Sequence, residues 1–414
     1  MSKLNKLMQE LCPEGVEYKT LGDLGSFYGG LTGKSKKDFG KGNAKFITYM
    51  NVYSNPALNP ETTDTVIILE GEKQNKIQYA DILFTGSSET PDECGMSSVV
   101  TCELNDDYYL NSFCFGYRLN EPRKFNPDFL KHYFRSQELR RAIAKTASGV
   151  TRYNVSKAKF AKIELPVLPL PVQEEIALIL DKFTTLEAEL EAELDCRKRQ
   201  YEFYRNQLLS FDKVGGASSE VKWMTIEQVC KNICSGGTPL TTNRSYYDGD
   251  IPWLRTQEVD WNEIYDTEVK ITKEALDNSS TKMIPANCVI VAMYGATAAK
   301  VAINRIPLCT NQACCNLEIN EDITLIKYVY QWLCKEYKNL KALGEGSQYN
   351  LNAKKVKSYE LPVPPLSEQS RIVSILDRFE ALTTDLQSGL PAEIEARRKQ
   401  YVYYREQLLT FNRL

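Results

Sequence analysis

The sequence predicts an α+β protein with two similar domains and two long helices that pair with each other. Three observations predict this class. One block of residues occurs twice, each copy carries a narrow apolar stripe at helical spacing, and the regions between the copies contain short strand-like runs. At 414 residues the chain is also too long for one ordinary hydrophobic core, which favours two or three domains.

The duplication is clearest in a block of fifteen residues. Residues 197–211 return as 397–411 with nine identical positions. Upstream, residues 164–167 and 360–363 share the sequence Glu-Leu-Pro-Val. Matched positions are 200 residues apart in the first block and 196 apart in the second, so the second copy contains four additional residues. A repeat of about 200 residues is too long for a solenoid, and it indicates a duplicated domain.

Each shared block predicts a long helix. Prolines precede both blocks, and proline keeps the residue before it out of the helical region. Pro171 fits the first turn of the first helix, and Ser367 is an N-cap candidate for the second. Downstream, apolar residues recur every three or four positions and form a narrow seam in each copy. The seam residues are Ile176, Leu180, Phe183, Leu190, Leu194, Tyr201 and Leu208, and then Ile372, Leu376, Phe379, Leu386, Leu390, Tyr401 and Leu408.

A seam this narrow does not bury itself. Either each helix packs on a globular domain, or the two copies pack on each other. We expect mutual pairing, because the seam is duplicated and neither copy has another obvious partner. From Pro171 to Phe211 the first helix would span about 60 Å. Gly389 and Pro391 predict an interruption of the second copy, and Leu390 keeps the seam spacing across it.

The regions between the shared blocks predict two α+β domains. Strand-like runs lie at 66–69, 82–85, 98–101, 289–294 and 299–303. Helical spacing lies at 129–147 and 326–343. The predicted organisation is a first domain at 1–163, a helical segment at 164–214, a second domain at 215–359 and a second helical segment at 360–414.

The charge is nearly balanced, with 51 basic and 54 acidic side chains, which argues against a protein that only coats nucleic acid. The basic residues are nevertheless concentrated. Residues 123–162 contain eleven Lys or Arg and two acids, and residues 327–357 contain seven Lys and two acids. A single lysine on a helix is usually only solvated. A matched pair of basic zones, one in each domain, favours contacts with the phosphates of double-stranded DNA.

Loops near these zones carry side chains that suit DNA. Arginine suits guanine, and asparagine or glutamine suits adenine, in the major groove. The predicted DNA-binding residues are Lys34, Lys36, Lys37, Lys41, Asn51, Ser87, Arg152, Tyr153, Asn243, Arg244, Arg255, Gln257, Gln348 and Asn350.

We expect no metal site. Cys230 and Cys234, and the adjacent Cys314 and Cys315, lack a second cysteine pair at zinc-ligand spacing, and His132 is the only histidine. No stretch resembles a signal peptide or approaches about twenty apolar residues. These features predict a cytoplasmic protein whose twelve cysteines are reduced, structural thiols.

We expect no catalytic residues and no cofactor either. Residues 33–35 (Gly-Lys-Ser) lack the upstream glycine of a P-loop, and residues 55–57 (Asn-Pro-Ala) do not form a methyltransferase Asn-Pro-Pro-aromatic loop. Residues 268–270 (Glu-Val-Lys) match the tail of a nuclease motif, but such triplets arise by chance in a chain with 25% charged residues. The remaining alternatives are a stand-alone DNA-binding regulator that reads a bipartite site and a coiled-coil scaffold.

The order of these motifs resembles the specificity subunit of Type I restriction–modification enzymes over essentially the whole chain. The resemblance rests on the duplicated blocks and on residues 11–18, 235–239, 251–253 and 361–369. It implies two target-recognition domains in an inverted, pseudo-two-fold arrangement, separated by an antiparallel coiled-coil spacer. Each domain would read one half of a bipartite, asymmetric DNA site. The helices would set the gap and dock two methyltransferase subunits, which would carry the S-adenosylmethionine, and restriction subunits could join them.

Overall fold

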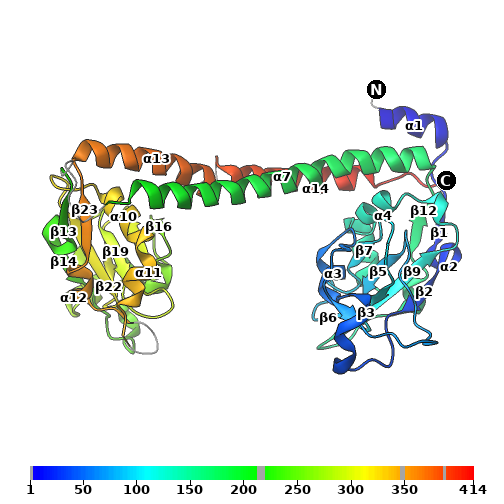
Figure 1. Cartoon of the computed structure of the whole chain (residues 1–414), viewed down its shortest axis with the longest axis horizontal. Coiled ribbons are helices and arrows are strands. Elements are labelled where there is room, and N and C mark those ends of the chain that lie inside the picture. Colours follow the sequence, from blue (N-terminus) through cyan, green and yellow to red (C-terminus); the bar gives the residue numbers. More distant parts are fainter. Residues whose placement is uncertain (1–2, 212–219, 346–349, 386–387) are drawn as a thin grey trace. The chain divides into compact units, whose positions relative to one another are not determined.

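The structure, a computed structural model, describes residues 3–211, 220–345, 350–385 and 388–414. It divides into two compact units (Figure 1): the first contains residues 1–191 and 393–414, and the second contains residues 192–392. Both units combine helices with mainly antiparallel sheets, so the α+β class is confirmed. The domain boundaries expected from the sequence stay a prediction.

The first unit begins with a short helix and continues into four sheets, and it includes the first part of α7 and most of α14 (Leu390–Leu408). Its four-stranded sheet has the order β2-β9-β5-β7, and three-stranded sheets form from β4-β3-β8 and β10-β11-β6. Its elements are α1 (Lys3–Leu11), β1 (Tyr18–Thr20), α2 (Leu21–Leu24), β2 (Gly25–Gly29), η1 (Lys36–Asp38), β3 (Phe39–Ile47), α3 (Tyr49–Ser54), β4 (Thr65–Val66), β5 (Ile82–Thr85), β6 (Ser87–Ser88), β7 (Ser97–Val99), β8 (Tyr108–Leu110), β9 (Cys114–Leu119), η2 (Pro122–Lys124), α4 (Pro127–Tyr133), α5 (Gln137–Ala144), β10 (Ala147–Ser148), β11 (Tyr153–Val155), α6 (Lys157–Phe160), β12 (Glu164–Pro166) and the start of α7 (Leu170–Leu208).

The second unit repeats this plan. Its main sheets have the orders β14-β22-β19-β20-β16 and β17-β15-β21-β18. Its elements are the end of α7, β13 (Lys222–Thr225), α8 (Ile226–Val229), β14 (Cys230–Ser235), η3 (Arg244–Tyr246), β15 (Tyr247–Leu254), η4 (Thr256–Glu258), β16 (Asn262–Ile264), β17 (Lys270–Ile271), α9 (Lys273–Asp277), β18 (Met283–Ile284), β19 (Val289–Ala292), β20 (Val301–Asn304), β21 (Leu308–Thr310), β22 (Cys314–Ile319), α10 (Ile326–Lys335), α11 (Tyr337–Ala342), α12 (Ala353–Lys357), β23 (Glu360–Val363) and α13 (Leu366–Thr384).

Matched contacts show that the two units share one topology. The Glu-Leu-Pro-Val segments form β12 and β23, which pair antiparallel with β1 and β13. The glycines that directly follow β2 and β14, Gly30 and Gly236, are required for the same structural reason. A Cβ on Gly30 would lie 2.0 Å from the carbonyl oxygen of Asn111, and a Cβ on Gly236 would lie 2.0 Å from that of Thr310. Only glycine allows so close an approach between backbones.

Several predicted elements have different bounds in the structure. The helices expected at 129–147 and 326–343 are each divided in two, α4 with α5 and α10 with α11. The first division occurs where the Ser136 hydroxyl caps α5 by accepting a hydrogen bond from the Leu139 amide. The strand expected at 299–303 begins only at Val301, because Ala299 has a left-handed backbone with φ 69°.

The run expected at 66–69 is a strand only at Thr65–Val66. The amide of Leu69 donates to the carboxylate of Glu72, so the chain turns there instead of extending. Ser367 as an N-cap is wrong, because α13 already begins at Leu366 and Pro365 occupies the cap position. Pro171 does lie in the first turn of α7.

The second long helix is interrupted, as Gly389 and Pro391 predict. Helix α13 ends at Thr384 and α14 (Leu390–Leu408) follows, whereas α7 runs without a break for 39 residues. Matched positions of the two copies are 196 residues apart before the break and 200 residues apart after it. The four additional residues of the second copy therefore lie around this interruption. They do not lengthen a continuous helix by one turn.

Candidate nucleic-acid interface and helix junctions

Each end of α7 packs on a domain core and on a helix of the other repeat. In the first unit, Ile176 and Leu180 are fully buried in a core that also contains Phe129 of α4 and Leu409. In the second unit, Ile372 and Leu376 of α13 occupy the matching places in a core with Leu209. Figure 1 shows α4 and α10 next to these helices. The apolar seam therefore packs both on a globular domain and on the helix of the other repeat.

Matched aromatic stacks join the two repeats within each unit. Phe183 stacks on Tyr404 with ring centroids 5.2 Å apart, and Phe379 stacks on Tyr204 at 5.3 Å. Arg398 also donates to the carboxylates of Glu187 and Glu191. The positions 183, 187 and 191 therefore face 404 and 398, so α7 and α14 run antiparallel in the first unit. Of the other predicted seam residues, Leu190, Leu194, Tyr201, Leu208, Leu390, Tyr401 and Leu408 are partly buried, and Leu386 lies outside the described residues.

Two buried glutamines connect these helices to the domains. The Gln173 amide nitrogen donates to the carbonyls of Leu168 and Lys124, and its oxygen accepts from the Asn126 amide. Gln369 repeats this arrangement with the carbonyls of Pro364 and Ile323 and the amide of Leu325. Because both glutamines belong to the shared blocks, the duplication preserves the way a helix enters its domain.

Some of the predicted DNA-binding residues meet in one pocket of the first unit. This hairpin pocket, of about 430 Å³, is lined by Tyr49, Met50, Tyr53, Ser87, Ser88, Glu89, Glu93, Thr151 and Arg152. Its walls are α3, β6 and the loop of the β10–β11 hairpin. Backbone pairing places Tyr153 opposite Ser88, beside the pocket. Ser87, Arg152 and Tyr153 are thus brought together from segments more than sixty residues apart.

The guanidinium of Arg152 is held so that its outer edge stays available. Its Nε donates to the Ser87 hydroxyl (3.1 Å), and its Cζ lies 5.6 Å from the centre of the Phe113 ring. Within the part of the chain that the structure describes, the two terminal nitrogens of Arg152 make no hydrogen bond. A guanidinium oriented in this way can bind two acceptors at once, as guanine N7 and O6 require.

An acidic group that the sequence reasoning missed lies in the same pocket. Glu93 accepts hydrogen bonds from the hydroxyls of Tyr53 (2.9 Å), Thr90 (2.9 Å) and Ser88 (3.2 Å). These hydrogen bonds, first the one from Tyr53, lower the pKa of the carboxyl. An ionised carboxylate can accept a hydrogen bond from the amino group of cytosine. No local pattern marks Glu93, because its partners come from different segments.

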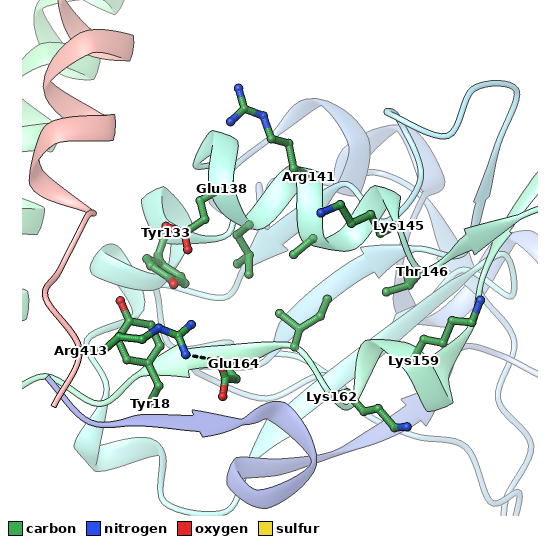
Figure 2. Close-up of a pocket in the computed structure, with 13 residues that line it drawn as sticks. Tyr18, Tyr133, Glu138, Arg141, Lys145, Thr146, Lys159, Lys162, Glu164 and Arg413 are labelled. Atoms are coloured by element: carbon green, nitrogen blue, oxygen red, sulfur yellow. Dashed lines mark hydrogen bonds and ion pairs between the residues drawn. The ribbon is translucent and has the colours of Figure 1, made fainter.

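Two arginines of the first basic zone are engaged within the domain. Arg135 donates to the carbonyls of Ser97, Val52 and Tyr53, and Arg140 donates to those of Gly95, Asp92 and Cys94. Burial lowers the pKa of each to about 10. Their guanidinium groups hold the segments that form the hairpin pocket. Four basic side chains of this zone, Arg141, Lys145, Lys159 and Lys162, instead line a second hollow of about 560 Å³ (Figure 2).

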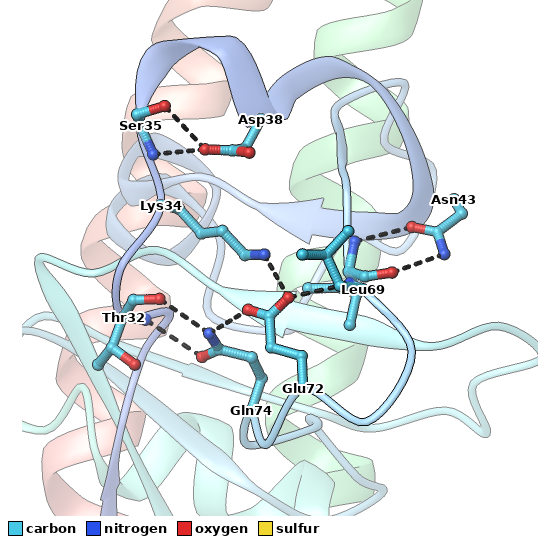
Figure 3. A network of polar contacts seen from close by, with 9 residues as sticks. Thr32, Lys34, Ser35, Asp38, Asn43, Leu69, Glu72 and Gln74 are labelled. Atoms are coloured by element: carbon cyan, nitrogen blue, oxygen red, sulfur yellow. Dashed lines mark hydrogen bonds and ion pairs between the residues drawn. The ribbon is translucent and has the colours of Figure 1, made fainter.

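The lysine cluster near residue 34 divides in the same way. The side chain of Lys34 is only 7% exposed, and its ammonium binds Glu72 at 2.5 Å. Figure 3 shows that Glu72 also accepts from Gln74 and from the Leu69 amide. Hydrogen bonds, first the one from Lys34, lower the pKa of Glu72 to about 2. Lys34 is therefore engaged in the fold rather than free for a phosphate, whereas Lys36, Lys37 and Lys41 are exposed.

Asn51 is also engaged within the domain. Its Nδ2 donates to the carbonyl of Asn59, and its Oδ1 accepts from the Asn59 amide and from Asn55. These contacts fix the end of α3 and occupy the groups that would read adenine. Asn51 lies on the same helix as Tyr49 and Tyr53 of the hairpin pocket, so its contacts help to fix the helix that carries these tyrosines.

In the second unit, three predicted residues lie around one loop. Arg255 and Gln257 flank Thr256, whose carbonyl accepts from the Thr297 hydroxyl. Asn350 lies exposed next to Leu351, whose amide donates to Met293. One terminal nitrogen of the Arg255 guanidinium is ion-paired with Glu268 at 2.5 Å, so this part of the side chain is engaged within the domain. Gln348 lies outside the described residues.

Asn243 and Arg244 occupy a different place in the second unit. Asn243 caps η3 by accepting from the Ser245 amide, and Arg244 is exposed. The short helix η3 directly precedes β15. In the first unit, η1, which contains Lys36 and Lys37, directly precedes β3 in the same way. No described hydrogen bond or ion pair joins these short helices to the loop clusters. Each unit thus carries two separate groups of candidate residues.

All twelve cysteines are free thiols. Burial raises the pKa of Cys230 and of Cys315, each to about 12, so these thiols are protonated at neutral pH. Among the described residues there is no group of three or more His, Cys, Asp or Glu side chains that could hold a metal ion. None of the described helices is long and apolar enough to span a bilayer.

Comparison with known proteins places these features in one family. The family model for the Type I restriction modification DNA specificity domain matches residues 13–195 and 218–396. The chain is 38% identical over 269 residues to the Type I restriction enzyme EcoR124I/EcoR124II specificity subunit of Escherichia coli, covering 63% of this chain and 65% of that subunit. It is 34% identical over 310 residues to a putative type I restriction enzyme specificity subunit of Haemophilus influenzae, covering 71% and 74%.

Solved structures show the same fold. A chain from a structure of a type I restriction–modification system aligns with a TM-score of 0.66 over 96% of this chain and 98% of that one, at 14% identity. The S subunit from Mycoplasma genitalium aligns with a TM-score of 0.52 over 95% and 96%, also at 14% identity. The E. coli alignment covers slightly less than two thirds of that subunit.

Proposed function

The chain belongs to the family of type I restriction–modification DNA specificity subunits, and from this premise we propose that it selects the DNA sequence on which a type I complex acts. The proposal is carried by one observation: the two units repeat one topology, and each presents a cluster of loops with base-reading side chains. In this proposal each unit reads one half of a bipartite site. The loop residues differ between the units, so the two halves differ in sequence.

The hairpin pocket supports a specific reading of the first half-site. Arg152 offers two terminal nitrogens to a guanine, and Glu93 offers carboxylate oxygen to the amino group of a cytosine. A G·C base pair presents both partners on one edge in the major groove. The exposed Met50 adds an apolar surface at the rim of the pocket. We therefore infer that the first half-site contains a G·C pair contacted by Arg152.

The partners in this proposal are two methyltransferase subunits. Support comes from a repeated exposed surface on the long helices. Phe203 on α7 and Tyr403 on α14 are both 61% exposed and occupy the same position of the duplicated block. Beside Tyr403 lies a hollow of about 520 Å³, lined also by Val402 and by the charged Arg398 and Glu406. Two equivalent surfaces suit two copies of one partner.

Catalysis and S-adenosylmethionine binding belong to the methyltransferase subunits in this proposal. The sequence contains no P-loop and no Asn-Pro-Pro-aromatic loop. The role of this chain is to bind DNA, to orient the partners and to hold the two reading clusters on helices that both units share. Restriction subunits would join through the methyltransferase subunits.

The decisive experiment is co-expression of the chain with candidate methyltransferase subunits in a host without adenine methylation, followed by genome-wide mapping of methylated adenine. The proposal expects a split motif that occurs only when this chain is present. An active methyltransferase that marks the same sites with and without the chain would refute it. A stand-alone regulator would instead bind its site equally tightly without methyltransferase subunits, so the affinity is measured with and without them.

The substitution Arg152→Lys tests the reading of the first half-site. Lysine keeps the positive charge but lacks the planar guanidinium group that donates two parallel hydrogen bonds. Removal of a bidentate hydrogen-bonded pair costs about 1–3 kcal/mol of discrimination, or roughly a factor of 5–150. The methylation map is expected to relax at one position of one half-site while the other half stays unchanged. Arg141→Lys, in the same unit but outside the hairpin pocket, is the control. Relaxation in both halves, or in neither, would contradict the assignment.

A further inference from the structure

A second hollow in the first unit has an uneven distribution of charge. It has a volume of about 560 Å³ and lies between α5, α6 and β12. Figure 2 shows Tyr18, Tyr133, Glu164 and Arg413 at one end. The other end is formed by Lys145, Thr146, Lys159 and Lys162. We call these three lysines the lysine triad.

The acidic side chains do not neutralise the lysine triad. The carboxylate of Glu164 accepts from Arg413 at 2.6 Å, and the Arg413 guanidinium covers the ring of Tyr18 at 4.2 Å. Glu138 lies at the same end, next to Tyr133. Within residues 3–211, 220–345, 350–385 and 388–414, no ion pair or hydrogen bond engages the ammonium of any triad lysine. Among the described residues, three positive charges therefore share one end of the hollow without an ion-paired carboxylate.

The second unit provides an internal comparison. The hydrogen bond from the Thr146 amide to the Ile143 carbonyl matches that from Leu343 to Leu340, so Lys145 corresponds to Ala342. The hydrogen bond from Leu21 to Ile163 matches that from Ile226 to Tyr359. By this second match, Lys159 corresponds to Lys355 and Lys162 corresponds to Ser358.

At these three corresponding positions the second unit carries a single lysine. Two of the three positions are uncharged there, and the ammonium of Lys355 binds the carboxylate of Glu345 at 2.5 Å. In the described part of the chain, the three positions therefore carry unpaired positive charges in the first unit and one ion-paired charge in the second. Like charges gathered in this way repel one another, and a bound anion removes that repulsion.

The position of the triad indicates which anion fits. Lys145 and Thr146 directly precede β10, and α6, which contains Lys159, directly follows β11. The hollow thus lies at the base of the hairpin whose loop carries Arg152. Lys157, at the start of α6, lies five positions after Arg152, which is at most about 17 Å of extended chain. That length corresponds to about five base pairs of DNA.

We propose that Lys145, Lys159 and Lys162 bind phosphate oxygens of the DNA backbone beside the half-site read by the hairpin pocket, and that the second unit lacks this anchor. The inference rests on the proposed DNA-recognition function. Phosphate contacts position a protein on the duplex without reading its sequence. The triad therefore contributes affinity and register through the first unit only, whatever the DNA sequence.

The test uses the full chain with its methyltransferase subunits and measures DNA affinity as a function of salt. In K145A/K159A/K162A, the slope of log K against log salt is expected to fall by about 0.9 for each phosphate that the variant no longer neutralises. The decrease should be the same for a duplex with the recognition site and for one without it. The control K19A/K73A/K76A removes the same charge from the same unit and is expected to keep the wild-type slope. K355A is expected to keep it as well.

Two results would overturn the inference. One is a triple variant with the wild-type salt slope on both duplexes. The other is binding of inorganic triphosphate that is abolished in the triple variant while its salt slope on DNA is unchanged, because the hollow would then serve a free polyphosphate. If the wild-type complex itself shows no salt-dependent DNA binding, the proposed function fails, and that outcome is distinct from both.

Discussion

Replacement of the buried glutamines by leucine is expected to destabilise one unit at a time. Gln173 and Gln369 have no exposed surface. Leucine is similar in size but its side chain cannot form hydrogen bonds, so Gln173→Leu leaves two carbonyls and one amide, all buried or partly buried, without this partner. Gln369→Leu leaves two carbonyls, one amide and the hydroxyl of Thr324.

The expected magnitude follows from the number of orphaned groups. Each buried polar group without a partner costs about 1–3 kcal/mol, and the local chain relaxes in part. We therefore expect the free energy of unfolding to fall by about 3–5 kcal/mol for each substitution. In units of about 200 residues, 1 kcal/mol shifts the melting temperature by about 2–4 °C. The shift should thus be roughly 6–20 °C, and slightly larger for Gln369 because it has one more partner.

Differential scanning calorimetry of the full chain is the appropriate assay, with hydrogen exchange to identify which unit opens. Gln173→Leu should increase exchange in residues 124–130 and at the start of α7. Gln369→Leu should do so in residues 323–329 and at the start of α13. The control Gln407→Leu, at an exposed position of α14, should shift the melting temperature by less than about 2 °C. Equal, small shifts for all three variants would refute the idea that these glutamines hold the helices to the domains.

Three further predictions concern the same helices. His132 lies between the hydroxyl of Tyr401 and the carboxylate of Asp181, and burial lowers its pKa, although the hydrogen bond with Asp181 opposes this. Below about pH 6.5 the unfolded state takes up a proton that the folded state refuses, so this contribution to stability is present above that pH and disappears as the pH falls. NMR titration of the only histidine should show a pKa below about 6.5, and His132→Gln should flatten the stability profile between about pH 5 and 7; a pKa above about 6.5 would contradict the assignment. A double-mutant cycle on Phe183 and Tyr404 should give a coupling of about 0.5–1.5 kcal/mol in urea unfolding, and a coupling near zero would show that the stack is incidental. Phe203→Ala and Tyr403→Ala should each reduce the number of bound methyltransferase subunits from two to one in mass photometry, without a change in melting temperature; retention of two subunits by the double variant would exclude these surfaces as docking sites.

The repeated parts of the fold could be predicted because their signals are local. Apolar spacing in the shared blocks identifies helices wherever those helices pack, and Gly389 with Pro391 identifies the break between α13 and α14. The ends of the shorter elements were less predictable. The division between α4 and α5 depends on the side chain of Ser136, and the start of β20 depends on the backbone of Ala299.

The basic zones show the limit of reading charge along a sequence. Arg135 and Arg140 count toward a positive zone in the sequence, yet in the fold they bind backbone carbonyls of their own domain. Lys34 is engaged by Glu72, which lies 38 residues away. A long cationic side chain can point to solvent or to an internal acceptor with equal ease, and only the neighbours brought by the fold select between them.

The order of residues along the chain is therefore enough to establish that this protein is duplicated, that its shared blocks are long helices and that it belongs with DNA specificity subunits. These properties depend on residue periodicity and motif order, which survive in one dimension. The three-dimensional arrangement was needed to show which cations remain free and that Glu93 joins Arg152 in one pocket. It was also needed to show that the lysine triad has no described ion pair, whereas Lys355 at a corresponding position of the second unit is paired with Glu345. This difference arises because hydrogen bonds and ion pairs are short-ranged, so they depend on side chains that the fold brings within about 3 Å from distant parts of the chain.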